Sequence, residues 1–212
     1  MDKVGRGLFW TAVVLAVVGL VGRLLLVDTW TVPEDRTLNA SIVPTLHEGD
    51  LLLVSKHGSV GMGDLVRCTD PEKADGWVVG RIVGLPGDQL EIAGQLLTVN
   101  HRTYGGEEVC LESPVLVVNP MSGDQVSLAC DTVHMGSVTH QRAYKTDRLF
   151  PPEPKTATVA GDRVYLLSDD RDFHEDSRDY GQIRRSSCNR ILFRAWGKQG
   201  WLDDKARLTL IH

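Results

Sequence analysis

The chain has 212 residues, of which 42% are hydrophobic and 24% charged, and its formal net charge is −5. This is the composition of a globular domain with a core, and it lacks the basic balance of a typical nucleic-acid-binding protein. The 21 glycines and nine prolines predict many turns, which suits a body of short strands better than a helical one.

The first element in chain order is an apolar stretch that begins at Leu8 and ends at Val27, with Arg23 as its single charge. Its length is enough to cross a bilayer core of roughly 30 Å as a helix. Trp10 and Trp30 lie near its ends, where aromatic rings favour the membrane interface. We therefore predict a membrane anchor, because a removable signal has a shorter apolar core and a buried soluble helix rarely runs this far without polar residues.

The charges around this stretch predict how the anchor is oriented. Arg23 is close enough to the end of the span for its side chain to reach the headgroups, the alternative being a pair with a carboxylate on a neighbouring subunit. Lys3 and Arg6 precede the span. They predict that the N-terminus stays on the cytoplasmic or matrix side and that the rest of the chain lies across the membrane.

Short apolar or alternating segments separated by turn residues follow a polar lead-in at 29–40, and they predict strands. These segments are 51–54, 64–68, 77–83, the hairpins 89–92/95–99 and 114–118/125–129, then 163–167 and 191–196. Residues 201–210 are expected to form a short amphipathic helix. The predicted fold class is mainly β, a β-barrel or sheet body behind one N-terminal transmembrane helix.

The four cysteines, Cys68, Cys110, Cys130 and Cys188, show no Cys-x-x-Cys spacing, and no zinc, other metal or cofactor site is evident. Cys110 and Cys130 flank a predicted hairpin and could face each other, but a disulfide needs an oxidising compartment. From the spacing alone we favour four independent buried thiols.

Three segments are informative together: Ser-Ile-Val-Pro-Thr-Leu from Ser41, Gly-Arg-Ile-Val-Gly-Leu-Pro-Gly-Asp from Gly80, and Asp-Ser-Arg-Asp-Tyr-Gly from Asp176. In this order behind an anchor they resemble the type I signal peptidase family, most closely its mitochondrial inner-membrane branch. The resemblance covers roughly residues 8–99 and 161–196. It implies an anchor at 1–30, two halves of a peptidase-like β core at 31–100 and 161–212, and a divergent insertion with a hairpin at 101–160.

The resemblance implies a serine nucleophile and a neutral lysine base whose pKa is lowered by burial. Ser41 is at the nucleophile position, expected in a loop held by Pro44 without a helix. Its backbone N–H would be one oxyanion donor, and the Asn39 amide a possible second. Gly80 is at the base position, and glycine has no side chain to accept a proton.

The third segment has also diverged from the family pattern. His174 replaces the serine that would orient the lysine. As a neutral imidazole it is a possible substitute base, and the endoplasmic-reticulum branch uses a histidine, although at the lysine position. The alternative is a surface histidine between charged neighbours. The retained residues imply a network of ion pairs that braces the floor of the site, formed by Arg81, Asp169, Arg171, Asp176 and Arg178.

Losing the base of a serine protease costs on the order of a million-fold in turnover, or about 8 kcal/mol. We therefore predict a degenerate, inactive accessory subunit of an inner mitochondrial membrane complex, with its body in the intermembrane space. Its partners would be the bilayer and other subunits, with no cofactor and no nucleic acid. Two alternatives stay open: an active leader peptidase using Ser41 and His174, and a pseudopeptidase that binds signal-like peptides without cutting them.

Overall fold

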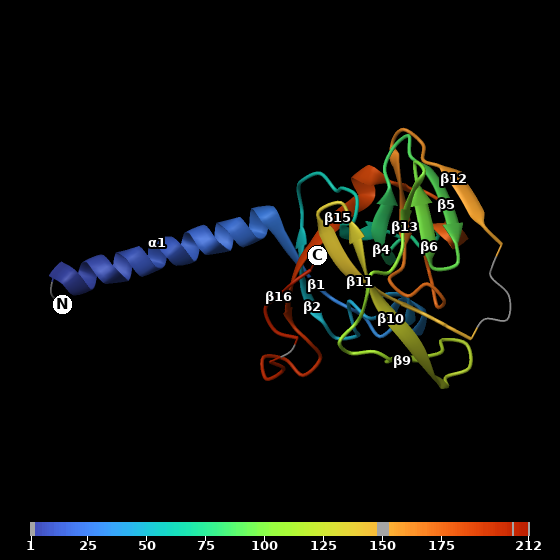
Figure 1. Cartoon of the computed structure of the whole chain (residues 1–212). Coiled ribbons are helices and arrows are strands. Elements are labelled where there is room, and N and C mark those ends of the chain that lie inside the picture. The colour runs from blue at the N-terminus through green and yellow to red at the C-terminus, as the bar shows by residue number, and fades with distance from the viewer. Residues whose placement is uncertain (1–2, 148–152, 205, 212) are drawn as a thin grey trace.

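The computed structural model describes residues 3–147, 153–204 and 206–211. Its elements run in chain order (Figure 1) as α1 (Lys3–Leu26), β1 (Val27–Thr31), α2 (Arg36–Ser41), β2 (Leu51–Ser55), β3 (Leu65–Thr69), β4 (Trp77–Gly84), β5 (Gln89–Ala93), β6 (Leu96–Val99), β7 (Arg102–Tyr104), β8 (Glu108–Val109), β9 (Val115–Val118), β10 (Gln125–Met135), β11 (Val138–Tyr144), β12 (Lys155–Thr158), β13 (Arg163–Leu167), α3 (Ser177–Tyr180), β14 (Ile183–Arg184), η1 (Arg185–Ser187), β15 (Cys188–Trp196) and β16 (Thr209–Leu210).

Three sheets make up the body. The largest follows the order β1-β2-β15-β3-β4-β13-β14, with β16 added to β15. A second sheet follows β12-β5-β6-β7, and a third follows β11-β10-β8 with β9 also paired to β10. The prediction of a mainly β fold is therefore confirmed. The division of the chain at residues 30, 100 and 160 stays a prediction.

Most predicted strands are present, and two segments differ. Both hairpins form, as β5–β6 and β9–β10. The polar lead-in instead holds β1 and α2. The helix expected at 201–210 is wrong, because this segment forms turns and then pairs Thr209 and Leu210 with Arg194 and Phe193. The strand β15 supplies these residues with backbone partners that a helix would exclude.

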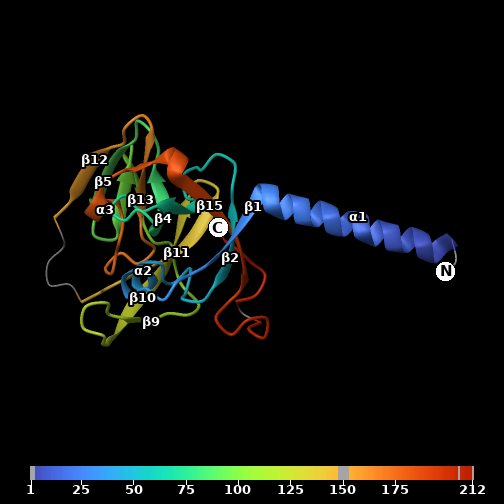
Figure 2. The same cartoon turned by 180° about the vertical axis from the view of Figure 1, so that it is seen from behind.

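Helix α1 projects away from the body (Figures 1 and 2). None of the helices that the structure describes combines the length and the apolar character needed to cross a bilayer. The side chains of Lys3, Arg6 and Arg23 lie outside what the structure describes. The anchor from Leu8 to Val27 and its orientation stay predictions.

The cysteines form two disulfides, Cys68–Cys188 and Cys110–Cys130, so the preference for four independent thiols is wrong. Strand pairing brings each pair together. Cys68 and Cys188 are directly opposite in β3 and β15, while the N–H of Cys110 donates to the carbonyl of Cys130 (3.1 Å). The first pair joins residues 120 positions apart, which local spacing could not show.

Strands β9, β10 and β11 pack directly on the Ser41 segment. Ala40 and Val43 share a buried apolar cluster with Val117 of β9, Leu128 of β10 and Ala143 of β11. The end of β11 also meets the segment after β13, because the Ala143 N–H donates to the Asp169 carbonyl (2.9 Å). The three strands that the resemblance did not cover therefore form one wall around the predicted site.

Candidate functional site

Ser41 is the last residue of α2 rather than part of a loop, which corrects the sequence expectation. Asp35 caps this helix, and its carboxylate accepts hydrogen bonds from the backbone N–H groups of Thr37 and Leu38 (2.9 and 3.1 Å). Pro44 restricts only Val43 before it, so residues 36–41 are free to be helical. The capping aspartate supplies the start signal that the sequence argument overlooked.

The Ser41 hydroxyl is fully buried and already donates a hydrogen bond within its own helix. Its Oγ donates to the Leu38 carbonyl one turn earlier (2.9 Å). Its own carbonyl accepts from the Asp170 N–H (3.0 Å). A backbone carbonyl accepts a hydrogen bond but cannot take up the proton, so this hydrogen bond does not activate the hydroxyl as a nucleophile.

Gly80 lies in β4, opposite Val66 of β3. A Cβ atom at this position would come within 3.1 Å of the Leu166 Cβ and 3.2 Å of the Leu167 carbonyl oxygen, both in β13. Glycine at this position thus accompanies a close approach of two strands. A side chain here would require β13 to shift, because the nearest atoms belong to backbone and to a Cβ.

Asn39 and His174 are both held by other partners. The Asn39 Nδ2 donates to the Pro33 carbonyl (3.1 Å). The His174 Nδ1 lies 2.7 Å from an Asp179 carboxylate oxygen, which also accepts from the Asp176 N–H as part of the α3 capping box. Neither contact involves Ser41, and the assignments of Asn39 as an oxyanion donor and His174 as a base stay predictions.

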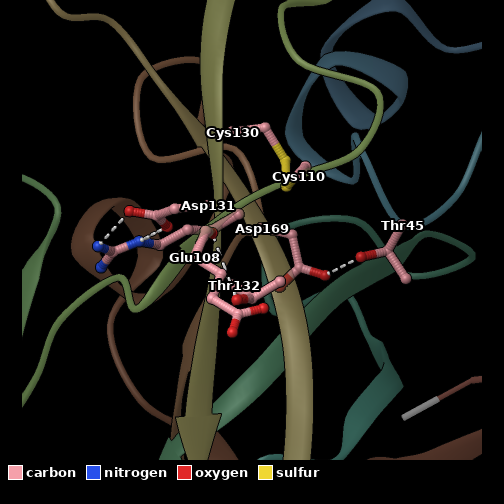
Figure 3. Close-up of a disulfide and its surroundings, with 8 residues drawn as sticks. Thr45, Glu108, Cys110, Cys130, Asp131, Thr132 and Asp169 are labelled. Carbon is pink, nitrogen blue, oxygen red and sulfur yellow. Dashed lines mark hydrogen bonds and ion pairs between the residues drawn. A yellow bond between two sulfur atoms is a disulfide. The ribbon is translucent and has the colours of Figure 1, made fainter.

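The Arg81 guanidinium holds Asp169 in a two-pronged ion pair. Its Nε and Nη2 lie 2.9 Å from the two carboxylate oxygens, and its Nη1 donates to the Gly63 carbonyl (2.7 Å). Thr45 of the Ser41 segment donates to the same carboxylate (2.5 Å), as Figure 3 shows. Burial alone would raise the pKa of Asp169, but Arg81 holds it below its ordinary value.

A second ion pair joins Arg178 to Asp176 within α3 and its cap. The Arg178 Nη2 lies 2.7 Å from the Asp176 carboxylate, which also accepts from the Ser168 N–H (2.8 Å). Arg178 donates further to the Arg171 carbonyl (3.1 Å). Burial opposes the charge, yet Arg178 keeps the pKa of Asp176 lowered. Of the five residues expected to form the floor network, four pair in this way, and Arg171 joins only through its backbone.

Sequence reasoning missed two buried titratable groups beside these pairs, and the first is His140. It is 4% exposed, and neither ring nitrogen has a hydrogen-bond partner among the residues the structure describes. Burial, and then the charge of Arg81, lower its pKa well below the ordinary value. Alternating exposure along β11 buries His140 and Arg142 on one face. The same period-2 pattern would have marked them had this segment been recognised as a strand.

The second missed group is Asp170, next to the Arg81 partner. It is fully buried; its Oδ1 accepts from the N–H groups of Asp172 and Phe173, and its Oδ2 has no partner within the described ranges. Burial raises the pKa of Asp170 to about 7 despite these two hydrogen bonds. The residue whose N–H bonds the Ser41 carbonyl therefore carries a buried carboxyl with a raised pKa.

Two other features of the site bear on ligands. His174, Asp176 and Asp179 are close enough to hold a metal ion, but Arg178 and the histidine ring already occupy the carboxylates. A cavity of about 460 Å³ opens beside the Ser41 segment. Its apolar wall is formed by Ala40, Val43, Leu116, Val117 and Val118. Its remaining lining residues are polar or titratable: Asn39, Glu34, Arg36, His47, Glu48 and Lys198.

Comparisons with known proteins agree on one family. The family model for signal peptidase, peptidase S26, matches residues 7–196. A mitochondrial ATP-independent inner membrane protease subunit 1a from Arabidopsis thaliana is 26% identical over 138 residues, covering 59% of this chain and 75% of that relative. Signal peptidase IB from Staphylococcus aureus is 24% identical over 192 residues, covering 87% of this chain and 85% of that relative.

Proposed function

This chain belongs to the signal peptidase family, peptidase S26, and we propose that it is a degenerate member that does not cleave peptides through Ser41. In this proposal it serves as an accessory subunit of a membrane complex. The observation that carries the proposal is Gly80 at the position of the base, where β13 runs so close that a Cβ atom would lie 3.1 Å from the Leu166 Cβ.

The size of the lost transition-state stabilisation supports an inactive protein rather than an enzyme of reduced activity. Losing the base alone costs about 8 kcal/mol of transition-state stabilisation. The Ser41 hydroxyl donates to a helix carbonyl, so its activation would also require breaking this bond. The retained pairs of Arg81 with Asp169 and Arg178 with Asp176 serve the fold, because buried arginine–carboxylate pairs are costly to disrupt whether or not chemistry occurs.

We propose a membrane location on the strength of α1. Its described side chains are apolar and largely exposed, among them Phe9, Trp10, Val14, Leu15, Val17, Val18 and Leu25. Such a surface is unfavourable in water. The inner mitochondrial membrane is supported by the name of the Arabidopsis relative. The two disulfides favour an oxidising compartment for the body.

Fractionation and protease protection test the location. Membrane pellets from the source cells should retain the chain after carbonate washing, and its body should be digested only when the compartment outside the matrix or cytosol is opened. Recovery in a washed soluble fraction would contradict the anchor, and digestion from the matrix or cytosolic side would contradict the orientation.

The Ser41→Ala variant tests the function. In cells that lack the native chain, this variant should restore assembly of its complex as fully as the wild type does, and leader-peptide processing should be unchanged. Deleting the whole chain should reduce assembly. An uncleaved precursor that accumulates only with Ser41→Ala would overturn the proposal.

A working peptidase is the second candidate, and the His174–Asp179 contact of 2.7 Å favours it. A carboxylate that orients an imidazole is half of a known catalytic arrangement. This candidate predicts that purified full chain in detergent cleaves leader peptides and that both Ser41→Ala and His174→Ala abolish the activity. His134→Ala is the matched control, since His134 also lies near a carboxylate, that of Glu107 (3.5 Å). Equal cleavage by Ser41→Ala, His174→Ala and His134→Ala would exclude a peptidase that uses Ser41 and His174.

A further inference from the structure

Arg171 is a buried cation that forms no ion pair with any residue the structure describes. It is 3% exposed, and its Nε and Nη1 have no hydrogen-bond partner in the described part of the chain. Its backbone is fixed, because its N–H donates to the Ala143 carbonyl (2.8 Å) and its own carbonyl accepts from Arg178 (3.1 Å). A buried charge without a partner costs several kcal/mol, so a structure that retains one is expected to supply a partner from outside.

A small cavity opens beside this guanidinium. It measures about 70 Å³ and is lined by Ile92, Gly94, Glu153, Lys155, Arg171, His174 and Arg178. Pockets for drug-sized ligands measure roughly 300–1,000 Å³, so this one fits a single ion or functional group. Its walls come from β5, β12, α3 and the segment before α3. These elements lie at the end of the body farthest from α1 (Figure 2).

The side chains that line the cavity carry more positive than negative charge that is not neutralised by a neighbour. Arg178 is neutralised by Asp176 (2.7 Å), and His174 contacts Asp179 (2.7 Å). The ammonium of Lys155 donates to the Arg178 carbonyl (2.9 Å), which leaves its charge uncompensated by any described carboxylate within ion-pair distance. Glu153 is the only carboxylate among the described lining residues. Two cationic side chains, Arg171 and Lys155, therefore face one acidic side chain.

We propose that this cavity binds a small soluble oxyanion of phosphate size, with the Arg171 guanidinium as its main ligand and Lys155 and His174 at its rim. Guanidinium groups bind tetrahedral oxyanions and carboxylates through paired N–H donors. Burial, then the charges of Arg178 and Arg142, lower the pKa of Arg171 to about 9, and the charges of Asp169 and Asp176 only partly oppose this shift. Its distance from α1 favours a soluble anion over a lipid headgroup. The inference does not depend on whether Ser41 is active.

Calorimetric titration of the full chain with sodium phosphate tests the site, at pH 7.5 and at an ionic strength held constant with sodium chloride. The wild type should show saturable binding that chloride alone does not reproduce. Arg171→Met should weaken binding by at least ~10-fold, since it removes charge-assisted hydrogen bonds. The matched control is Arg102→Met, because Arg102 is exposed on β7 away from the cavity.

Two surface variants keep the test decisive if Arg171→Met does not fold. Lys155→Ala should weaken phosphate binding and Glu153→Gln should strengthen it, because they remove opposite charges at one rim. Vesicles that carry phosphorylated lipid headgroups should compete poorly with free phosphate. The absence of saturable binding, or unchanged affinity in Lys155→Ala and Glu153→Gln together, would overturn the site.

Discussion

Three consecutive residues after β13 meet different electrostatic environments, although all three are buried. Asp169 has Arg81 as its partner, Asp170 keeps one unpartnered oxygen, and Arg171 has no carboxylate within ion-pair distance among the described residues. Because an isolated buried charge is costly, these residues and the nearby His140 should govern how stability depends on pH.

The Asp170→Asn substitution should stabilise the protein at alkaline pH and have little effect near pH 4.5. Burial raises the pKa of Asp170 from 3.8 to about 7, so the folded protein binds more protons than the unfolded chain between these values. Stability then rises as pH falls from about 7 towards 4. Chemical denaturation should give a gain at pH 8 on the order of 3–4 kcal/mol for the variant.

Asp162→Asn provides the control, because the Asp162 side chain is 73% exposed. Its stability profile should follow that of the wild type. If the Asp170→Asn profile is parallel to the wild-type profile from pH 4.5 to pH 8, then Asp170 is ionised throughout and its assigned environment is wrong.

His140 should change the stability of the protein with pH in the direction opposite to Asp170. Burial and the charge of Arg81 lower its pKa well below 6.5, so the unfolded chain takes up a proton that the folded protein refuses. The stability contributed by this group is complete above about pH 6.5 and is lost as pH falls below it. Relative to wild type, His140→Leu should gain more than about 1 kcal/mol between pH 7 and pH 5.

This gain has to be measured as the difference in stability between His140→Leu and wild type at each pH. Asp170 and His140 change the stability of the wild type in opposite directions between about pH 4 and pH 7, so its own pH profile is flattened. His57→Leu, at an exposed histidine, should show no such gain. An identical pH profile for His140→Leu and wild type would mean that the imidazole is protonated in the folded protein.

At the scale of elements, the contact between β4 and β13 decides whether the lost base could be restored. Gly80→Ala should destabilise the protein by about 1–3 kcal/mol, because the new Cβ would lie 3.1 Å from the Leu166 Cβ. Gly80→Lys should cost at least as much and should not produce cleavage. Urea denaturation and a leader-peptide assay measure the two effects.

Gly161→Ala is the matched control, because a Cβ there meets nothing within 4 Å, and its stability should be unchanged or slightly improved. A stable Gly80→Lys variant that cleaves a leader peptide, and loses this activity with Ser41→Ala, would show that β13 yields readily and that the site is one substitution from working.

Local patterns in the sequence predicted strands well and the Ser41 segment poorly. The hairpins β5–β6 and β9–β10 follow from alternation interrupted by turn residues. Helix α2 has only six residues, and its signal is a single capping aspartate, Asp35, followed by no clear helical period. The restriction that Pro44 places on the chain before it favours a loop, whereas the chain forms a helix as far as Ser41. The buried roles of His140 and Asp170 depend on β11 packing against the segment after β13, which no local pattern encodes.

For the whole molecule, the order of strands lay beyond sequence reasoning. Strand β15 inserts between β2 and β3, so a strand near the C-terminus pairs with two strands from the first third of the chain. Such long-range pairing depends on which buried faces fit together, and not on any single segment. The same pairing aligns Cys68 with Cys188, and it explains why spacing arguments favoured free thiols.

The two disulfides should therefore contribute unequally to stability. Cys68–Cys188 closes a loop of 120 residues and Cys110–Cys130 one of 20. Loop-closure entropy assigns them about 4–5 and about 3 kcal/mol respectively. The double variant Cys68→Ala/Cys188→Ala should lose more stability in guanidinium than Cys110→Ala/Cys130→Ala. Alkylation of the wild type without reductant, followed by intact mass measurement, should label no thiols. Four labelled cysteines would contradict both bridges, and would remove the argument that the body occupies an oxidising compartment.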